Sequence, residues 1–107
     1  MSDEGDRRAA ERIPVISGTT CSFVAPVIED FGTAKIRDVS LDGVGLILLR
    51  KVELGTTLAI GLSNPTKGFA KTVMVKVVHV TPVHGGFLVG GQFTAPLSYL
   101  ELTTLVM

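Results

Sequence analysis

Short apolar runs alternate with polar, glycine-containing turns along most of the chain, and this spacing is typical of β-strands. The clearest run is residues 69–81, where Val73, Val75 and Val77 fall on one parity and polar or long side chains fall on the other. Successive side chains of a strand point to opposite faces of a sheet. This segment is therefore predicted to be a strand with one face in the core.

Five other segments of strand length share this alternation or form short continuous apolar runs. Polar loops separate them, most clearly at residues 63–68, and residues 83–86 carry the glycine signal of a hairpin. Pro26 indicates an edge or a bulge in the first run, which carries Cys21, Phe23, Ala25 and Val27 on one parity. These five predicted strands are the run from Thr20 and residues 35–40, 44–49, 58–62 and 87–93.

The period changes after Thr94, where the spacing of four leucines, with Pro96 near the start, predicts a short C-terminal helix. Six strands in hairpin succession favour an antiparallel barrel or sandwich, and a barrel leaves no exposed sheet edge. We therefore predict an all-β fold, a six-stranded antiparallel β-barrel over residues 13–107 with this helix at its end. Residues 1–12 are predicted to be a flexible, charged N-terminal arm.

Composition narrows the class of protein. The chain has 107 residues, of which 46% are hydrophobic and 19% charged, as expected for one globular domain. Ten basic and ten acidic residues cancel, so the net charge gives no reason to expect DNA or RNA as a partner. The charged N-terminus is unlike a secretory signal peptide, and no apolar run is long enough for membrane insertion. We therefore expect a soluble cytoplasmic protein.

The residue types that usually carry catalysis do not form a recognisable set. His79 and His84 are the only histidines, and no third metal ligand accompanies them, so both are expected to be structural or surface residues. No serine lies in a Gly-x-Ser-x-Gly elbow. The single cysteine, Cys21, lies in an apolar run and is expected to be a buried small hydrophobe. We therefore expect neither an enzyme, nor a metal site, nor a cofactor.

A short polar segment, residues 38–43, lies between two apolar runs and reads Asp-Val-Ser-Leu-Asp-Gly. In an extended backbone the side chains of Asp38 and Ser40 project from one face. Gly43 allows either a turn or the close approach of a ligand to the backbone. The same residue types also build ordinary β-turns, in which their side chains bond only the local backbone. The segment alone therefore leaves a turn and a binding site as alternatives.

A pair of arginines upstream favours a binding site over a plain turn. Arg8 and Arg12 form an Arg-x-x-x-Arg segment, and guanidinium groups match both phosphate oxygens and the O6 and N7 acceptors of guanine. A carboxylate such as that of Asp38 accepts hydrogen bonds from guanine N1–H and N2–H, and a serine hydroxyl bonds phosphate or a base edge. Together the two segments carry the groups needed to bind a guanine nucleotide.

The order and spacing of these segments resemble the signature of the PilZ domain family, receptors for the bacterial second messenger cyclic di-GMP. That signature is RxxxR followed after some twenty to thirty residues by D/NxSxxG, on a six-stranded β-barrel. The resemblance covers nearly the whole chain, because residues 43–46 and 89–93 also fit the runs that follow in the family. It implies a nucleotide-binding domain that acts in second messenger signalling.

The resemblance also implies roles for particular residues. The two arginines of RxxxR clamp guanine and phosphate from a flexible arm, and the DxSxxG turn meets the ligand from the barrel surface. Arg7 adds a third guanidinium able to stack on guanine, from which we expect two intercalated ligand molecules. Ordering of the arm by the ligand then signals to an unidentified downstream protein partner. The implied ligand-binding residues are Arg7, Arg8, Arg12, Asp38, Ser40 and Gly43.

Two other functions remain as alternatives. A PilZ-like protein-interaction module that binds no nucleotide would keep the fold and use the arm to contact a partner. A barrel that binds single-stranded nucleic acid would need surface aromatics and a positive groove. One tyrosine, no tryptophan and a net charge of zero argue against this last function.

Overall fold

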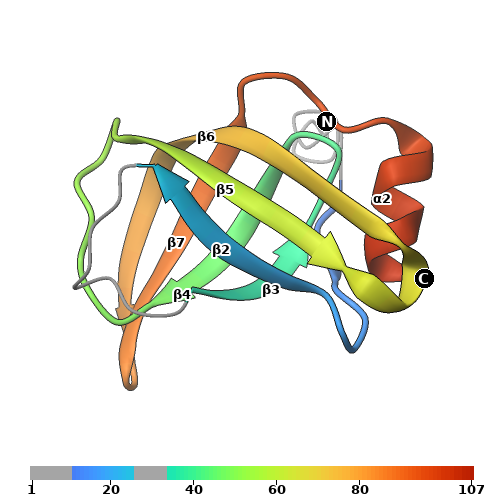
Figure 1. The fold of residues 1–107 in the computed structure, drawn as a ribbon. Helices are drawn as coiled ribbons and strands as arrows, with labels where there is room; N and C mark the ends of the chain where they lie inside the picture. The colour runs from blue at the N-terminus through green and yellow to red at the C-terminus, as the bar shows by residue number, and fades with distance from the viewer. Residues whose placement is uncertain (1–10, 26–33) are drawn as a thin grey trace, which may run out of the picture.

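The structure, a computed structural model, describes residues 11–25 and 34–107, whose strands form one antiparallel sheet curled around an apolar core (Figure 1). It confirms the predicted all-β fold with one short C-terminal helix. The elements in chain order are β1 (Ile13–Pro14), β2 (Thr20–Ala25), β3 (Lys35–Val39), β4 (Gly43–Leu48), β5 (Thr57–Asn64), the 3-10 helix η2 (Pro65–Lys67), β6 (Phe69–Val83), β7 (Gly86–Phe93) and α2 (Tyr99–Val106).

The sheet has seven strands in the order β1-β3-β4-β7-β6-β5-β2, which differs from the predicted barrel in two respects. The additional strand, β1, pairs Ile13 with Val39 and Pro14 with Asp38. Two residues are too few to show an alternating pattern, so the sequence did not reveal it. No ladder joins β2 to β3 within the described residues, so the sheet is a curled half-barrel whose edges are β1 and β2. Pro26 and Val27 lie outside the described residues.

Alternation along the strands accounts for the core. Val73, Val75 and Val77 of β6 are all buried, as predicted, and the residues between them are exposed. Cys21 is also buried, and burial raises the pKa of its thiol to about 11, so the thiol is neutral at physiological pH. The largest side chains with almost no exposure are Leu46, Leu48, Leu58, Ile60, Leu62 and Leu105.

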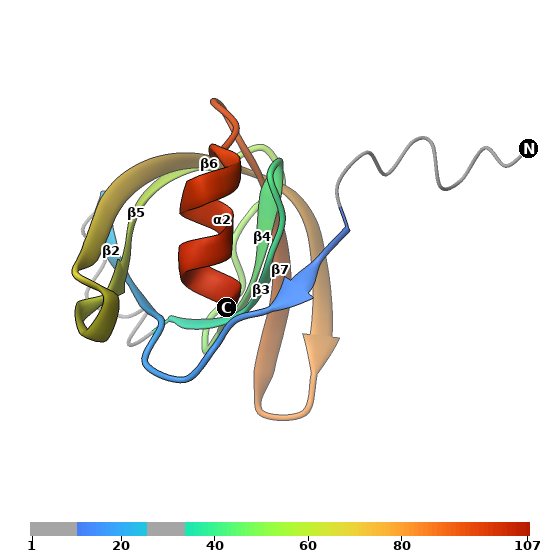
Figure 2. The same cartoon turned by 90° about the vertical axis from the view of Figure 1, so that its right-hand side faces the viewer.

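The helix α2 lies across one end of the curled sheet (Figure 2). It begins with a capping box, in which the Ser98 hydroxyl accepts from Glu101 N and the Glu101 carboxylate accepts from Ser98 N. Leu102 and Leu105 are buried, whereas Leu100 remains 75% exposed. Helix α2 therefore closes the core with one face only.

Two predicted turns are present. The β6–β7 hairpin turns at His84 and Gly85, where Gly85 adopts a φ of 87° that favours glycine. The loop after β5 contains η2, which Asn64 caps at its start. Neither helix in the described ranges has the length and apolar character that a bilayer crossing requires.

Candidate functional site

Asp38 is the buried acidic residue of the site and lies in β3. The β3–β4 register shifts between Ile36 and Asp38, so Arg37 is the additional residue of a β-bulge. Asp38 then pairs with Gly45 of β4, and its side chain is only 11% exposed. A carboxylate with so little access to water needs charged or hydrogen-bonding partners.

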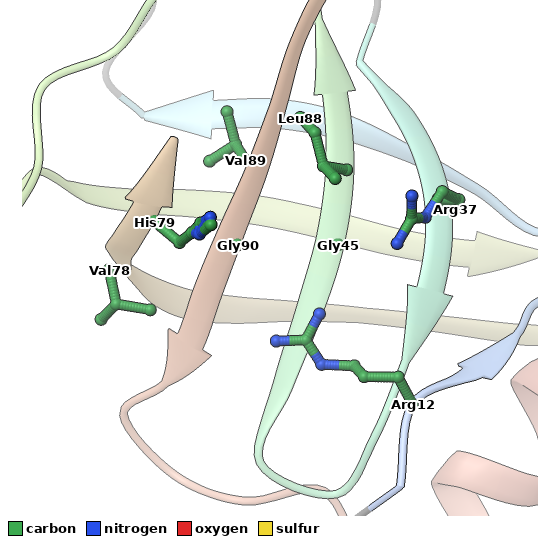
Figure 3. Close-up of a pocket in the computed structure, with 8 residues that line it drawn as sticks. All are labelled: Arg12, Arg37, Gly45, Val78, His79, Leu88, Val89 and Gly90. Atoms are coloured by element: carbon green, nitrogen blue, oxygen red, sulfur yellow. The ribbon is translucent and has the colours of Figure 1, made fainter. Parts of the chain in front are cut away.

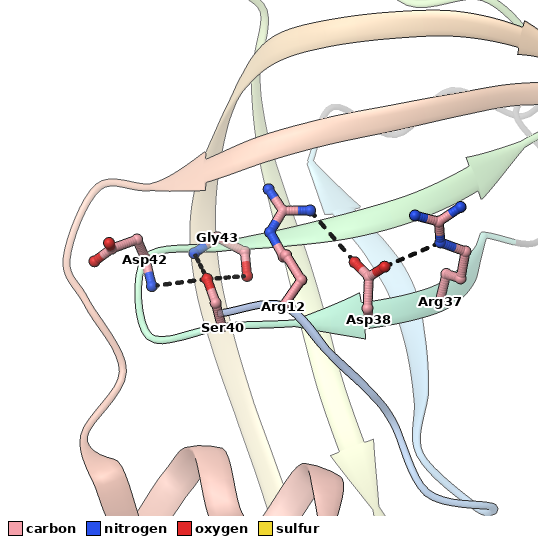
Figure 4. A network of polar contacts seen from close by, with 6 residues as sticks. All are labelled: Arg12, Arg37, Asp38, Ser40, Asp42 and Gly43. Carbon is pink, nitrogen blue, oxygen red and sulfur yellow. Dashed lines mark hydrogen bonds and ion pairs between the residues drawn. The ribbon is translucent and has the colours of Figure 1, made fainter. Parts of the chain in front are cut away.

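Two arginines supply those partners, one for each carboxylate oxygen (Figure 4). Arg12 Nη1 donates to Asp38 Oδ1 at 3.3 Å, and Arg37 Nε donates to Asp38 Oδ2 at 3.0 Å. The arginine side chains are 42% and 54% exposed, so water screens both ion pairs and each is worth at most about 1 kcal/mol. Either arginine can therefore exchange at low cost for a ligand whose own donors replace it on the carboxylate.

The guanidinium of Arg12 lies over two glycines of β4. A Cβ atom at Gly43 would be 3.4 Å from Arg12 Nη2, and one at Gly45 would be 3.3 Å from Arg12 Nη1 and would collide with Asp38 Oδ1. The φ of Gly43 is not positive, and a Cβ there would also collide with the carbonyl oxygen of Gly91 in β7. Gly43 is thus needed for the close approach of Gly91 and Arg12 rather than for an unusual turn conformation, and the approach of a ligand stays a prediction.

Ser40 instead bonds the turn between β3 and β4. Its hydroxyl oxygen accepts from Asp42 N at 3.2 Å and from Gly43 N at 3.1 Å. The hydroxyl donates to the Gly43 carbonyl at 3.4 Å, well beyond the typical O–H···O distance of about 2.7 Å. Ser40 therefore has the turn-forming role that the sequence left open, while its donor is weakly engaged.

A pocket of about 210 Å³ lies beside this network, across β4, β7 and β6 (Figure 3). Gly45 and Gly90 are paired across β4 and β7, and His79 is paired with Gly90 across β7 and β6. The pocket thus has a strip without side chains, with Arg12 and Arg37 on one side and His79 on the other. Such a surface suits a flat ligand that accepts hydrogen bonds from guanidinium groups.

The structure therefore brings together three of the predicted residues and adds others. Arg12 bonds Asp38 and lies over Gly43, Ser40 shapes the turn, and Arg7 and Arg8 lie outside the described residues. The sequence did not identify four pocket residues, Arg37, Gly45, His79 and Gly90.

The sequence held a signal for only one of these four residues. Gly45 follows Gly43 by two positions and therefore lies on the same face of a strand. The other three become neighbours only through bulges and strand pairing. Among residues 11–25 and 34–107, no group of histidine, cysteine and acidic side chains could hold a metal ion.

Comparison with known families identifies the domain, because the family model described as PilZ domain matches residues 6–106. The chain belongs to the PilZ domain family. PilZ domains are a family of cyclic di-GMP receptor domains, and the matched range includes both the RxxxR and the DxSxxG segments of this PilZ domain. No curated protein is similar enough in sequence to be recognised as its relative.

Proposed function

We propose that this PilZ domain binds cyclic di-GMP on the surface formed by Arg12, Asp38 and Gly43, with Arg7 and Arg8 joining from upstream. The observation that carries the proposal is the contact between Arg12 and Asp38, 26 residues apart, over two glycines whose lack of a side chain makes room for the guanidinium. An arginine and a carboxylate at one position supply both kinds of group that a guanine base needs.

Each part of the surface has a chemical role in this proposal. The Arg12 guanidinium donates to O6 and N7 of one guanine or to a phosphate oxygen. Asp38 accepts from guanine N1–H and N2–H after a screened arginine contact has exchanged. Ser40 donates its weakly engaged hydroxyl to phosphate or a base edge. No described residue is placed for covalent chemistry in this proposal, so the domain acts by binding.

Signalling follows from the position of Arg12 in the chain. Strand β1 begins at the next residue, and just after it Ile16 N donates to the Leu105 carbonyl in α2 at 3.0 Å. A ligand held by Arg7, Arg8 and Arg12 orders the upstream segment against the sheet, and fixing each residue costs about 1 to 2 kcal/mol. We propose that a downstream protein partner recognises the surface so formed.

Calorimetric titration of cyclic di-GMP tests the site. Arg8→Ala and Arg12→Ala should each weaken binding by roughly tenfold to a hundredfold, because a bidentate arginine–guanine pair contributes about 1 to 3 kcal/mol. Lys67→Ala, on the exposed η2, removes the same charge away from the site and should leave affinity unchanged. Equal binding by wild type and both arginine variants would refute the site, and no binding by wild type would favour the protein-interaction module.

The same titration gives the stoichiometry, and amide exchange tests the switch. A third guanidinium at Arg7 supports two intercalated ligand molecules per domain, and a stoichiometry of one would contradict that. Within residues 5–14, the amides that precede β1 should become protected when the ligand binds. Unchanged protection would argue against signalling through this segment.

A further inference from the structure

A second hollow, of about 500 Å³, lies next to the pocket beside Arg12 and shares Val78 and His79 with it. Its other walls come from Val80 in β6 and from residues 51–54, in the loop that leads from β4 to β5. The first pocket faces β7 and the second faces the β5 side of β6, so the two hollows meet over one short stretch of β6.

Strand pairing explains why a hollow forms there. Backbone bonds join β6 as far as Val77 to the two residues just before β5, because the Val77 carbonyl accepts from Gly55 N and its N–H donates to Thr56 O. Beyond that point the β6–β7 register shifts, and Val78 becomes the additional residue of a bulge. Residues 51–54 lie before the β5–β6 ladder, which starts at Thr57, and a concave space remains between them and β6.

The side chains of this hollow combine opposite charges with apolar walls. Lys51 and Glu53 are exposed, and neither side chain has a hydrogen bond or ion pair within the described part of the chain. Leu54 is 66% exposed and Val78 is 50% exposed, which leaves apolar surface for the face of a ring. The hollow therefore offers an acceptor pair, a donor and a stacking surface, all without partners among the described residues.

These groups match guanine better than adenine. A carboxylate accepts from N1–H and N2–H of guanine together, and an ammonium group donates to O6 or N7. Adenine presents an unprotonated N1 beside its exocyclic amine, so the same carboxylate meets an acceptor there. The first pocket, at about 210 Å³, is also smaller than the roughly 300 to 1,000 Å³ typical for a whole drug-sized ligand.

We propose that this hollow is a second guanine subsite, in which Glu53 and Lys51 read a second guanine base of the bound ligand. His79 and Val78 separate it from the first pocket and contact both bases. This inference rests on the proposed cyclic di-GMP function and adds residues that lie in neither the RxxxR nor the DxSxxG segment.

The test compares cyclic di-GMP with cyclic GMP-AMP, a hybrid that carries one guanine, by calorimetry on the full chain. Wild type should bind cyclic di-GMP about tenfold more tightly than the hybrid, the lower range for a bidentate base contact. Glu53→Gln replaces one acceptor with a donor, so this preference should fall to about twofold or less. Lys51→Ala should also reduce it, whereas the matched charge variant Lys67→Ala should retain it.

The outcomes separate this subsite from the proposed function. If wild type binds both ligands equally, or if Glu53→Gln keeps the full preference, the second subsite is wrong while cyclic di-GMP binding stands. Arg12→Ala should weaken both ligands, because it acts on the first pocket. If wild type binds neither ligand, the proposed function and the second subsite both fail.

Discussion

The four polar residues buried in the described structure form two clusters of opposite character. In the first cluster, Asn64 Nδ2 donates to Thr19 Oγ1 at 2.9 Å, and the Thr19 hydroxyl donates to the Leu105 carbonyl at 3.2 Å. All the polar groups of this cluster are neutral, and both hydrogen bonds are buried. In the second cluster, Ser40 bonds its own turn, while the charge of Asp38 is met by arginines that reach into solvent.

This difference separates polar groups that hold the fold from polar groups that can bind a ligand. Breaking a buried neutral hydrogen bond leaves a group that water cannot reach, which costs about 1 to 3 kcal/mol. Exchanging a half-exposed arginine on Asp38 for a ligand donor costs at most about 1 kcal/mol, because water solvates the freed guanidinium and the carboxylate keeps a partner. The Asn64 cluster should therefore govern stability, and the Asp38 cluster should govern ligand affinity.

The largest effect predicted from this comparison is on stability, for Asn64→Ala. Asn64 has no exposed surface, bonds Thr19 and caps η2 by accepting from Lys67 N at 3.3 Å. Loss of the cap and of the buried partner should lower the free energy of unfolding by about 2 to 4 kcal/mol, measured by urea denaturation. Affinity for cyclic di-GMP, measured below the unfolding transition, should not change.

Thr66→Ala provides the control, in the 3-10 helix that Asn64 caps. Thr66 is exposed in η2, and its replacement should change stability by no more than about 0.5 kcal/mol. If Asn64→Ala weakened ligand binding as strongly as it weakened the fold, the two clusters would be coupled and the distinction between them would be wrong.

Gly45→Ala, in the cluster around Asp38, is predicted to act mainly on ligand affinity and only weakly on stability. The new methyl group would collide with Asp38 Oδ1 and approach Arg12 Nη1. Both side chains would then move away from the pocket that Gly45 and Gly90 line. Affinity for cyclic di-GMP should fall by about tenfold. Stability should fall by only about 1 kcal/mol, at the low end for overpacking, because the displaced arginine is half-exposed.

Gly61→Ala is the matched substitution in β5. The nearest atom to its new methyl group would be Ser22 Oγ at 3.3 Å, the end of a short side chain that can rotate. Calorimetry should show unchanged affinity for this control. Equal affinity for wild type and Gly45→Ala would mean that the glycine strip does not contact ligand.

Local pattern predicted most of the fold because the core follows it. Val73, Val75 and Val77 are buried through simple alternation, and the glycine signal at the β6–β7 turn gives a true hairpin. The short β1 and the open edge between β2 and β3 depend on pairing over long distances in the chain. No local period records such pairing, so the predicted closed six-stranded barrel was wrong in those details.

The candidate site was predicted in part, for a similar reason. Of the motif residues, Arg12 bonds Asp38 and lies over Gly43, while their role in binding a ligand stays a prediction. Arg37 was not predicted, and His79 was predicted to be a structural or surface residue, because bulges bring both to the pocket and a bulge shifts which face a residue occupies. The motif residues could therefore be identified from the sequence, whereas the other residues of the pocket wall are set by the pairing and bulges of the sheet.

The smallest predicted effect comes from an ion pair outside both clusters. Lys71 Nζ lies 2.7 Å from Glu101 Oε2, and the two side chains are 39% and 26% exposed. The hydrogen bond from Lys71, followed by that from Ser98 N, lowers the pKa of Glu101 from its ordinary value of 4.5. Because the folded value is the lower one, the stabilisation is complete above pH 4.5 and disappears as the pH falls through the folded value.

Glu101→Gln should therefore lower the Tm slightly at neutral pH, and the difference from wild type should shrink as the solution is acidified below pH 4.5. Thermal unfolding of both proteins, from neutral pH to below pH 4.5, measures this difference in Tm. A difference that did not vary with pH would mean that the capping hydrogen bonds of Glu101, not its charge, stabilise α2. Affinity for cyclic di-GMP at neutral pH should be the same in both proteins, because a charged pair on the surface acts on a ligand only where it lines the site.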